Sequence, residues 1–161
     1  MKISIIYHSV GGNTKKVADI IAEGAKIKDD IEVKSMSIDE LDEKFIEESK
    51  AVIFGCPTYH ATFSWQMKKW FDTNKISFEG KLGSVFATEN FLGGGADVAE
   101  LSMIGHMLVM GMLIYSAGHT KKGPITHYGA VTIKDGDEWQ QNRARILGQR
   151  VAEKSLEIFG A

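Results

Sequence analysis

Short apolar runs alternate with longer amphipathic segments along this chain, and this alternation constrains its fold more than any other feature. The apolar runs have the length of buried strands, and the longer segments have the period of about 3.6 residues that helices show. The predicted strands are Lys2–Tyr7, Ile31–Ser37, Ala51–Cys56, Leu82–Thr88 and Gly111–Ser116. The predicted helices are Thr14–Lys26, Asp39–Ser49, Gln66–Asn74, Asp97–Met110 and Glu138–Phe159. Because such alternation is typical of a parallel sheet covered on both faces, we expect an α/β, doubly wound, open sheet of five parallel strands.

Length and composition indicate one globular domain over residues 1–161. The chain is 43% apolar and 25% charged, and its net charge of −2 gives no attraction to nucleic acid or to an anionic membrane. Cys56 is the only cysteine, which excludes an internal disulfide and suits a reducing compartment. We see no signal peptide and no apolar run of membrane-spanning length, so we expect a cytoplasmic protein without nucleic-acid or membrane partners.

The stretch IIYHSVGGNT, Ile5 to Thr14, leads from the first predicted strand through a small polar turn into the first helix. A helix N-terminus presents unpaired N–H groups with a partial positive charge, which favours a bound phosphate. Gly11 and Gly12 allow the backbone to approach closely. Side-chain donors are added by Ser9, Asn13 and Thr14. A simple helix cap is the alternative, but it needs only one such residue. The Walker and dinucleotide glycine patterns are both absent, so a terminal monophosphate fits best.

This loop resembles the phosphate loop of the flavodoxin-like superfamily. The resemblance continues through most of the chain, in Cys56–Tyr59, Gln66–Asp72, Gly80–Phe86, Gly93–Gly95 and Tyr128–Ala130. In pattern the chain is most similar to NAD(P)H:quinone oxidoreductases of the tryptophan-repressor-binding-protein type. The resemblance implies the strand order 2-1-3-4-5.

The resemblance also implies FMN, with its 5′-phosphate on the loop Ser9–Thr14 and its ring between the loops Pro57–His60 and Thr88–Gly95. The implied cofactor-binding residues are Ser9, Val10, Gly11, Gly12, Asn13, Thr14, Pro57, Thr58, Tyr59, His60, Thr88, Glu89, Asn90, Gly93, Gly94 and Gly95. Tyr59 is a candidate for stacking on the ring. A carboxylate of Glu89 beside the ring would lower its reduction potential, and a solvated loop charge is the alternative.

Two positions depart from the pattern of those quinone reductases. Thr88–Leu92 is bulkier than their usual Ser-Thr-Gly and carries a carboxylate, and Met110 stands where they tend to have histidine. The histidines show no metal-ligand spacing, so we expect no metal; they are His8, His60, His106, His119 and His127. Catalytic candidates are His127 and Tyr128, with a plain surface role as the alternative for His127. Cys56 is predicted to be a small buried hydrophobe.

These features favour an FMN-dependent NAD(P)H oxidoreductase that takes electrons from NADPH or NADH and reduces a quinone or a similar acceptor. The alternative is a flavodoxin-type carrier of single electrons between proteins, against which the low net charge argues because carriers dock through acidic surfaces. A phosphate-binding regulatory module is a third hypothesis. The resemblance also implies a homo-oligomer, either a dimer or a tetramer.

Overall fold

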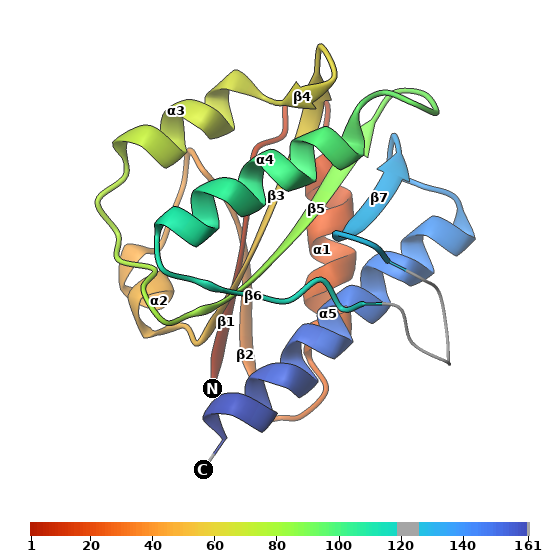
Figure 1. The fold of residues 1–161 in the computed structure, drawn as a ribbon. Coiled ribbons are helices and arrows are strands. Elements are labelled where there is room, and N and C mark those ends of the chain that lie inside the picture. Colours follow the sequence, from red (N-terminus) through yellow and green to blue (C-terminus); the bar gives the residue numbers. More distant parts are fainter. Residues whose placement is uncertain (119–125, 161) are drawn as a thin grey trace.

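A parallel sheet forms the centre of the protein, and its strands follow one another in the order β2-β1-β3-β5-β6 (Figure 1). The computed structural model describes residues 1–118 and 126–160. The strands in this order are β2 (Glu32–Ser37), β1 (Lys2–Tyr7), β3 (Ala51–Tyr59), β5 (Leu82–Glu89) and β6 (Leu113–Ile114). Since β5 and β6 correspond to the fourth and fifth predicted strands, the expected parallel, doubly wound order 2-1-3-4-5 is confirmed.

Two further strands lie beside this series, which the sequence did not predict. The short strand β4 (Thr62–Phe63) forms an antiparallel hairpin with β3. The strand β7 (Ala130–Ile133) pairs with the carboxyl-terminal half of β5, whereas β6 pairs only with Leu82 and Gly83. The predicted strand Gly111–Ser116 was therefore too long, and the fifth position is shared between β6 and β7.

The segment Ala117–Ala130, which contains none of the predicted strands or helices, lies between β6 and β7 in the chain. At its start Ala117 has a φ of +64°, which no extended strand contains. Its last residue is the first residue of β7, and residues 119–125, which include His119, lie outside the described residues.

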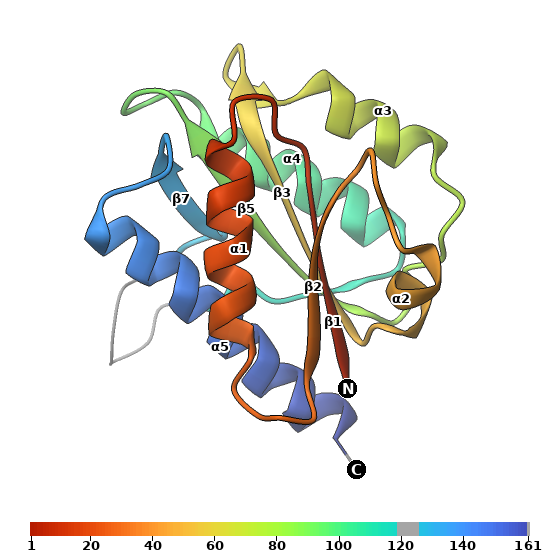
Figure 2. The same cartoon turned by 180° about the vertical axis from the view of Figure 1, so that it is seen from behind.

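Helices cover both faces of the sheet (Figures 1 and 2). The helices α1 (Asn13–Ala25) and α5 (Glu138–Phe159) pack together on one face. On the other face lie α2 (Glu43–Glu48), α3 (Trp65–Thr73) and α4 (Ala96–Val109). Because side chains alternate along a strand, Ile3 and Ile53 join the core under α1 and α5, while Ile6 and Phe54 join the opposite core. All five predicted helices are confirmed, with shifted ends in four of them.

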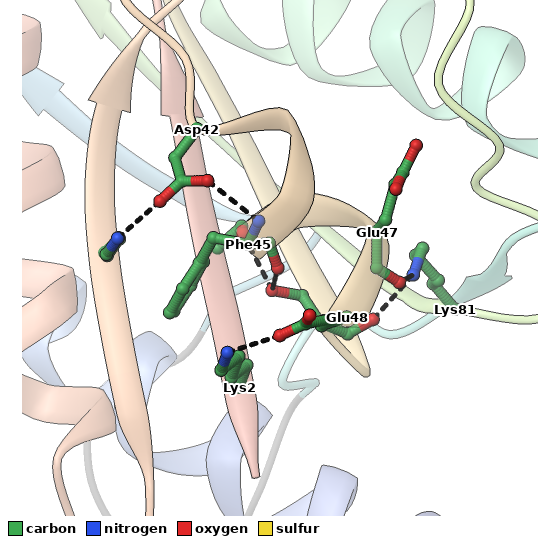
Figure 3. Close-up of polar contacts among 9 residues, drawn as sticks. Lys2, Asp42, Phe45, Glu47, Glu48 and Lys81 are labelled. Carbon is green, nitrogen blue, oxygen red and sulfur yellow. Dashed lines mark hydrogen bonds and ion pairs between the residues drawn. The ribbon is translucent and has the colours of Figure 1, made fainter.

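The helix α2 is shorter than the predicted segment Asp39–Ser49, because Asp42 caps it: its carboxylate accepts the Phe45 N–H at 3.0 Å (Figure 3). Lys2 pairs with Glu48, and Lys81 Nζ donates to the carbonyls of Glu47 and Ser49, each at 2.7 Å. These contacts hold α2 at the amino ends of β1 and β5.

Candidate functional site

The loop between β1 and α1 leads to the N-terminus of α1, where the N-cap residue is Gly12 and supplies no side-chain hydrogen bond. Gly12 begins the helix with a φ of +90°, a conformation that glycine adopts without strain. A Cβ atom at Gly11 or Gly12 would meet no atom within 4 Å, so open space lies beside both residues. Within the described chain, the N–H groups of Gly11, Gly12, Asn13 and Thr14 donate to no protein acceptor. The loop therefore offers a cluster of free backbone donors.

Hydroxyl groups tie this loop to its surroundings. The Oγ1 atoms of Thr14 and Thr88 lie 2.8 Å apart in a buried hydrogen bond, which joins the first turn of α1 to the end of β5. Ser9 Oγ accepts the N–H of Lys15 at 3.3 Å. The loop after β1 and the end of β5 are therefore joined, and together they form the first wall of a cavity.

The hairpin of β3 and β4 forms a second wall. Tyr59 pairs with Thr62, so His60 and Ala61 make a two-residue turn with φ values of +48° and +64°. Such turns normally contain Asn or Gly, because other residues are strained at positive φ. The Tyr59 ring meets the His8 ring edge-on at 6.1 Å between centroids, and His8 Nδ1 lies 2.9 Å from Ser64 Oγ. Burial lowers the pKa of His8, because desolvation disfavours the charged form of its ring.

The loop between β5 and α4 forms the third wall. The Glu89 side chain is only 7% exposed, and its Oε2 accepts the N–H of Ala96 at the start of α4, at 3.2 Å. The alternative of a solvated loop charge at Glu89 is therefore wrong. Gly95 has a φ of +95°, and a Cβ atom there would lie 2.4 Å from the Cα of Ala61. The glycine run thus lets the third wall pack against the hairpin.

A cavity of about 210 Å³ lies between the three walls. It is lined by Ser9, Val10, Gly11, Asn13, Thr14, Pro57, Thr58, Tyr59, Thr88, Glu89, Asn90 and Lys134. All but the last of these residues were predicted from the sequence, and the structure brings them together. Gly12 shapes the phosphate loop without lining the cavity.

The remaining predicted residues lie elsewhere. His60 lines a second cavity of about 720 Å³ on the outer side of the hairpin, together with Trp65. A third cavity of about 920 Å³ is lined by Gly93, Gly95, His127 and Tyr128. Gly94 lines none of the three cavities. Glu89 borders both the first and the third cavity and so stands between them.

Lys134 is the residue at the first cavity that sequence reasoning missed. It follows β7, and its backbone N–H donates to the Glu89 carbonyl at 2.7 Å. The signal was the run AVTI, which has strand-forming residues and precedes the turn KDGD. Lys134 adds a cationic residue to the lining of the cavity that the phosphate loop also lines.

Other expectations concern residues away from this site. Cys56 is fully buried, as predicted, and burial raises the pKa of its thiol to about 12. Among residues 1–118 and 126–160, no three His, Cys, Asp or Glu side chains are grouped to hold a metal ion. No helix in the described part of the chain has both the length and the apolar character needed to cross a membrane.

Comparison with known proteins places these features in context. The family model described as Flavodoxin matches residues 5–95. A flavodoxin from Clostridium saccharobutylicum is 48% identical over 160 residues, covering 99% of this chain and 100% of that protein. An NAD(P)H dehydrogenase (quinone) from Archaeoglobus fulgidus is 29% identical, with 94% of this chain and 96% of that protein covered.

A solved structure of a flavodoxin, WrbA-like protein from Agrobacterium tumefaciens superposes with a TM-score of 0.82 at 23% identity. The superposition covers 97% of this chain and 98% of that one. At this level of identity the likeness concerns the fold alone.

Proposed function

This chain belongs to the flavodoxin family, and we propose that it binds FMN and carries single electrons between partner proteins. The observation that carries the proposal is the open N-terminus of α1, where four consecutive N–H groups lack protein acceptors beside a cavity. When bound, FMN supplies a ring that takes up and releases electrons, and the protein sets its position and its electrostatic surroundings.

The phosphate loop fits a phosphate group. The donors are the N–H groups of Gly11, Gly12, Asn13 and Thr14, and the partial positive charge of α1 stands behind them. Lys134 adds a full positive charge at the same cavity. No carboxylate precedes or caps α1 to compete for these donors. A monophosphate would therefore be held by α1 and oriented by the buried pair of Thr14 and Thr88.

The other walls fit the ring of FMN. Pro57, Thr58 and Tyr59 line one side of the cavity, and Glu89 and Asn90 line another. The Glu89 carboxylate is nearly buried, so little water screens its charge. It opposes added negative charge in the cavity, which lowers the reduction potential of a bound ring. A low potential suits a protein that donates electrons to other proteins.

The relatives favour the carrier over the reductase. The flavodoxin relative matches over its whole length, whereas the dehydrogenase alignment spans 185 positions against the 161 residues of this chain. Those dehydrogenases thus contain additional residues. The net charge of the whole chain was the argument against a carrier, but docking depends on the surface around the site. There Val10, Phe91 and Leu92 are exposed apolar side chains, which suit contact with a partner protein.

Anaerobic reduction of the FMN-loaded protein tests this proposal. Stepwise addition of dithionite is expected to give a strong organic-radical signal in electron paramagnetic resonance at half reduction. NADPH and NADH alone are expected to leave the flavin absorbance unchanged over minutes. Prompt bleaching by either nucleotide, with no radical signal at half reduction, would contradict the carrier role.

A second candidate is the FMN-dependent NAD(P)H oxidoreductase that reduces quinones or similar acceptors. The cavity of about 920 Å³ favours it, since this cavity adjoins the proposed FMN site at Glu89 and contains His127 and Tyr128. Here NADPH or NADH would be the donor, and prompt flavin bleaching followed by reoxidation with a quinone would support it. A Tyr128→Phe variant would then lower the turnover rate if Tyr128 acts on the substrate.

A further inference from the structure

Among the described residues, two buried polar atoms without hydrogen-bond partners belong to residues that line the cavity adjoining the proposed FMN site at Glu89. The carboxyl of Glu100, on α4, is 1% exposed, and its Oε1 has no hydrogen-bond partner. Nε of Arg143, on α5, is also buried without a partner. Unpaired groups of this kind are costly in a folded protein, and most buried polar atoms have partners. Both residues line the cavity of about 920 Å³.

The cavity is built closely around these groups. A Cβ atom at Gly129 would lie 2.6 Å from Glu100 Oε1 and 2.0 Å from the Val85 carbonyl, so only glycine leaves room for the carboxyl there. The Arg143 guanidinium lies over the Trp139 ring at 4.7 Å from its centroid, which fixes the direction of the side chain. The Glu100 carboxyl is therefore enclosed, and the Arg143 guanidinium lies against an aromatic ring of the same cavity.

Apolar and aromatic side chains supply the remaining walls. Trp139 and Tyr128 expose ring surface at the cavity, and Leu92, Val98 and Val131 add aliphatic surface. Flat aromatic molecules bury most area against such walls, since aromatic pairs stack or meet edge-on.

Charge decides which aromatic molecule fits. An anion would meet the carboxyl groups of Glu89, Asp97 and Glu100, and a cation would lie beside Arg143. Burial raises the pKa of Glu100 well above its usual value; the charges of Asp97 and Glu89 act in the same direction, and the charge of Arg143 opposes them. A neutral carboxyl both donates through its O–H and accepts through its carbonyl, and Arg143 Nε–H is a further donor. The matching partner is a neutral group with one donor and one strong acceptor side by side.

We propose that the cavity between α4, β7 and α5 binds a neutral aromatic compound with a carboxamide or lactam edge, which pairs with Glu100 and Arg143. The amide N–H donates to Glu100, and the amide carbonyl accepts from Glu100 and from Arg143 Nε. The ring lies against Trp139 and Tyr128. This inference goes beyond the proposed electron carrier and does not depend on it, because Glu89 is the only residue of the described part of the chain that both cavities share.

Three probes of the same shape and different charge test the proposal: benzamide, benzoate and benzamidine. Each is titrated into the full chain, with and without saturating FMN, while the Trp139 indole N–H and the Gly129 amide are followed by NMR. Benzamide is expected to shift both signals to saturation, and each charged analogue to bind at least about tenfold more weakly. Failure of benzamide to shift these signals, or an equal or tighter affinity for a charged analogue, would overturn the proposal.

Substitutions at Glu100 separate hydrogen bonding from charge. Glu100→Met removes both the donor and the acceptor and is expected to weaken benzamide binding at least about tenfold. Glu100→Gln keeps a donor and an acceptor without ionising, so affinity is expected to stay within about threefold. An equal loss in the two variants would contradict the paired amide edge.

Arg145→Met is the matched control, because Arg145 lies on the same helix, is exposed and pairs with Glu23 at 3.7 Å. It is expected to leave benzamide binding unchanged, whereas Arg143→Met weakens it. An equal effect of the two arginine variants would count against the site. If Glu100→Met fails to fold, the comparison of the three probes on the unmodified chain still decides the outcome.

Discussion

Gly95 joins two walls of the proposed FMN site at a single position. Its φ of +95° disfavours any side chain, and a Cβ atom there would overlap the backbone of Ala61. Gly93 offers a contrast within the same loop, because its φ is +81° but open space surrounds it. Substituting each glycine in turn therefore separates two destabilising effects, the backbone strain of a positive φ and the steric overlap with Ala61.

We predict that Gly95→Ala lowers the free energy of unfolding by about 3 kcal/mol, from backbone strain and overlap together. Gly93→Ala is expected to cost about 1 kcal/mol, from strain alone. Urea denaturation of both variants measures the difference. Equal losses would show that the contact between Gly95 and Ala61 contributes nothing.

His8 is a single residue that makes the stability of the folded protein depend on pH. Burial lowers the pKa of His8 in the folded protein below its value in the unfolded chain, which is about 6.5. The neutral ring of His8 therefore contributes to the free energy of unfolding above a pH of about 6.5. This contribution is lost as the pH falls, because the unfolded chain binds the proton more readily. We predict that His8→Gln flattens the rise of the melting temperature between pH 5 and pH 8. An unchanged slope in the variant would contradict this role.

The hairpin of β3 and β4 is a strained element at the edge of the site. His60 and Ala61 both have positive φ in its two-residue turn. We predict that replacing them with Asn and Gly, the residues typical of such turns, raises the free energy of unfolding by about 1 to 2 kcal/mol. Thermal unfolding of the double variant measures the gain, and a loss of stability would show that the native pair makes contacts that outweigh the strain.

The length of a helix or strand explains whether it could be predicted from the sequence. α5 and β1 have enough residues to show their period, and their predicted ends match the structure. β4 contains only Thr62 and Phe63, and β7 contains four residues, whose strand-forming run AVTI is too short to show a period. Patterns of that length do not distinguish a strand from a loop.

The same reasoning applies to the candidate site. The carboxyl ends of β1, β3 and β5 lie side by side in the predicted order, so the loops after them were expected to meet, and they do. Lys134 was missed because it follows the unrecognised strand β7. The sequence resemblance implied that Gly95 binds the flavin. Its close approach to Ala61 is a packing contact between distant parts of the chain, which no local sequence pattern can predict. Whether the predicted residues bind FMN stays a prediction.

At the scale of the whole molecule, α4 presents an apolar outer face. Val98, Leu101, Leu108 and Val109 are exposed along it, and a contiguous apolar surface is typical of an interaction site. We therefore keep the expectation of a homo-oligomer as a prediction. Sedimentation velocity is expected to show at least twice the mass of the chain, and Leu101→Lys is expected to shift it to the monomer. A monomer at every protein concentration would contradict it.

Binding of FMN and of riboflavin by the flavin-free protein tests the proposed phosphate site, because the two ligands differ only by the phosphate. In the proposed complex that phosphate accepts hydrogen bonds from the N–H groups of Gly11 to Thr14, at a cavity that Lys134 also lines. Charge-assisted hydrogen bonds of this kind predict that FMN binds at least about 100-fold more tightly than riboflavin in a fluorescence titration. Equal affinities for the two ligands, or no binding of FMN, would contradict the account.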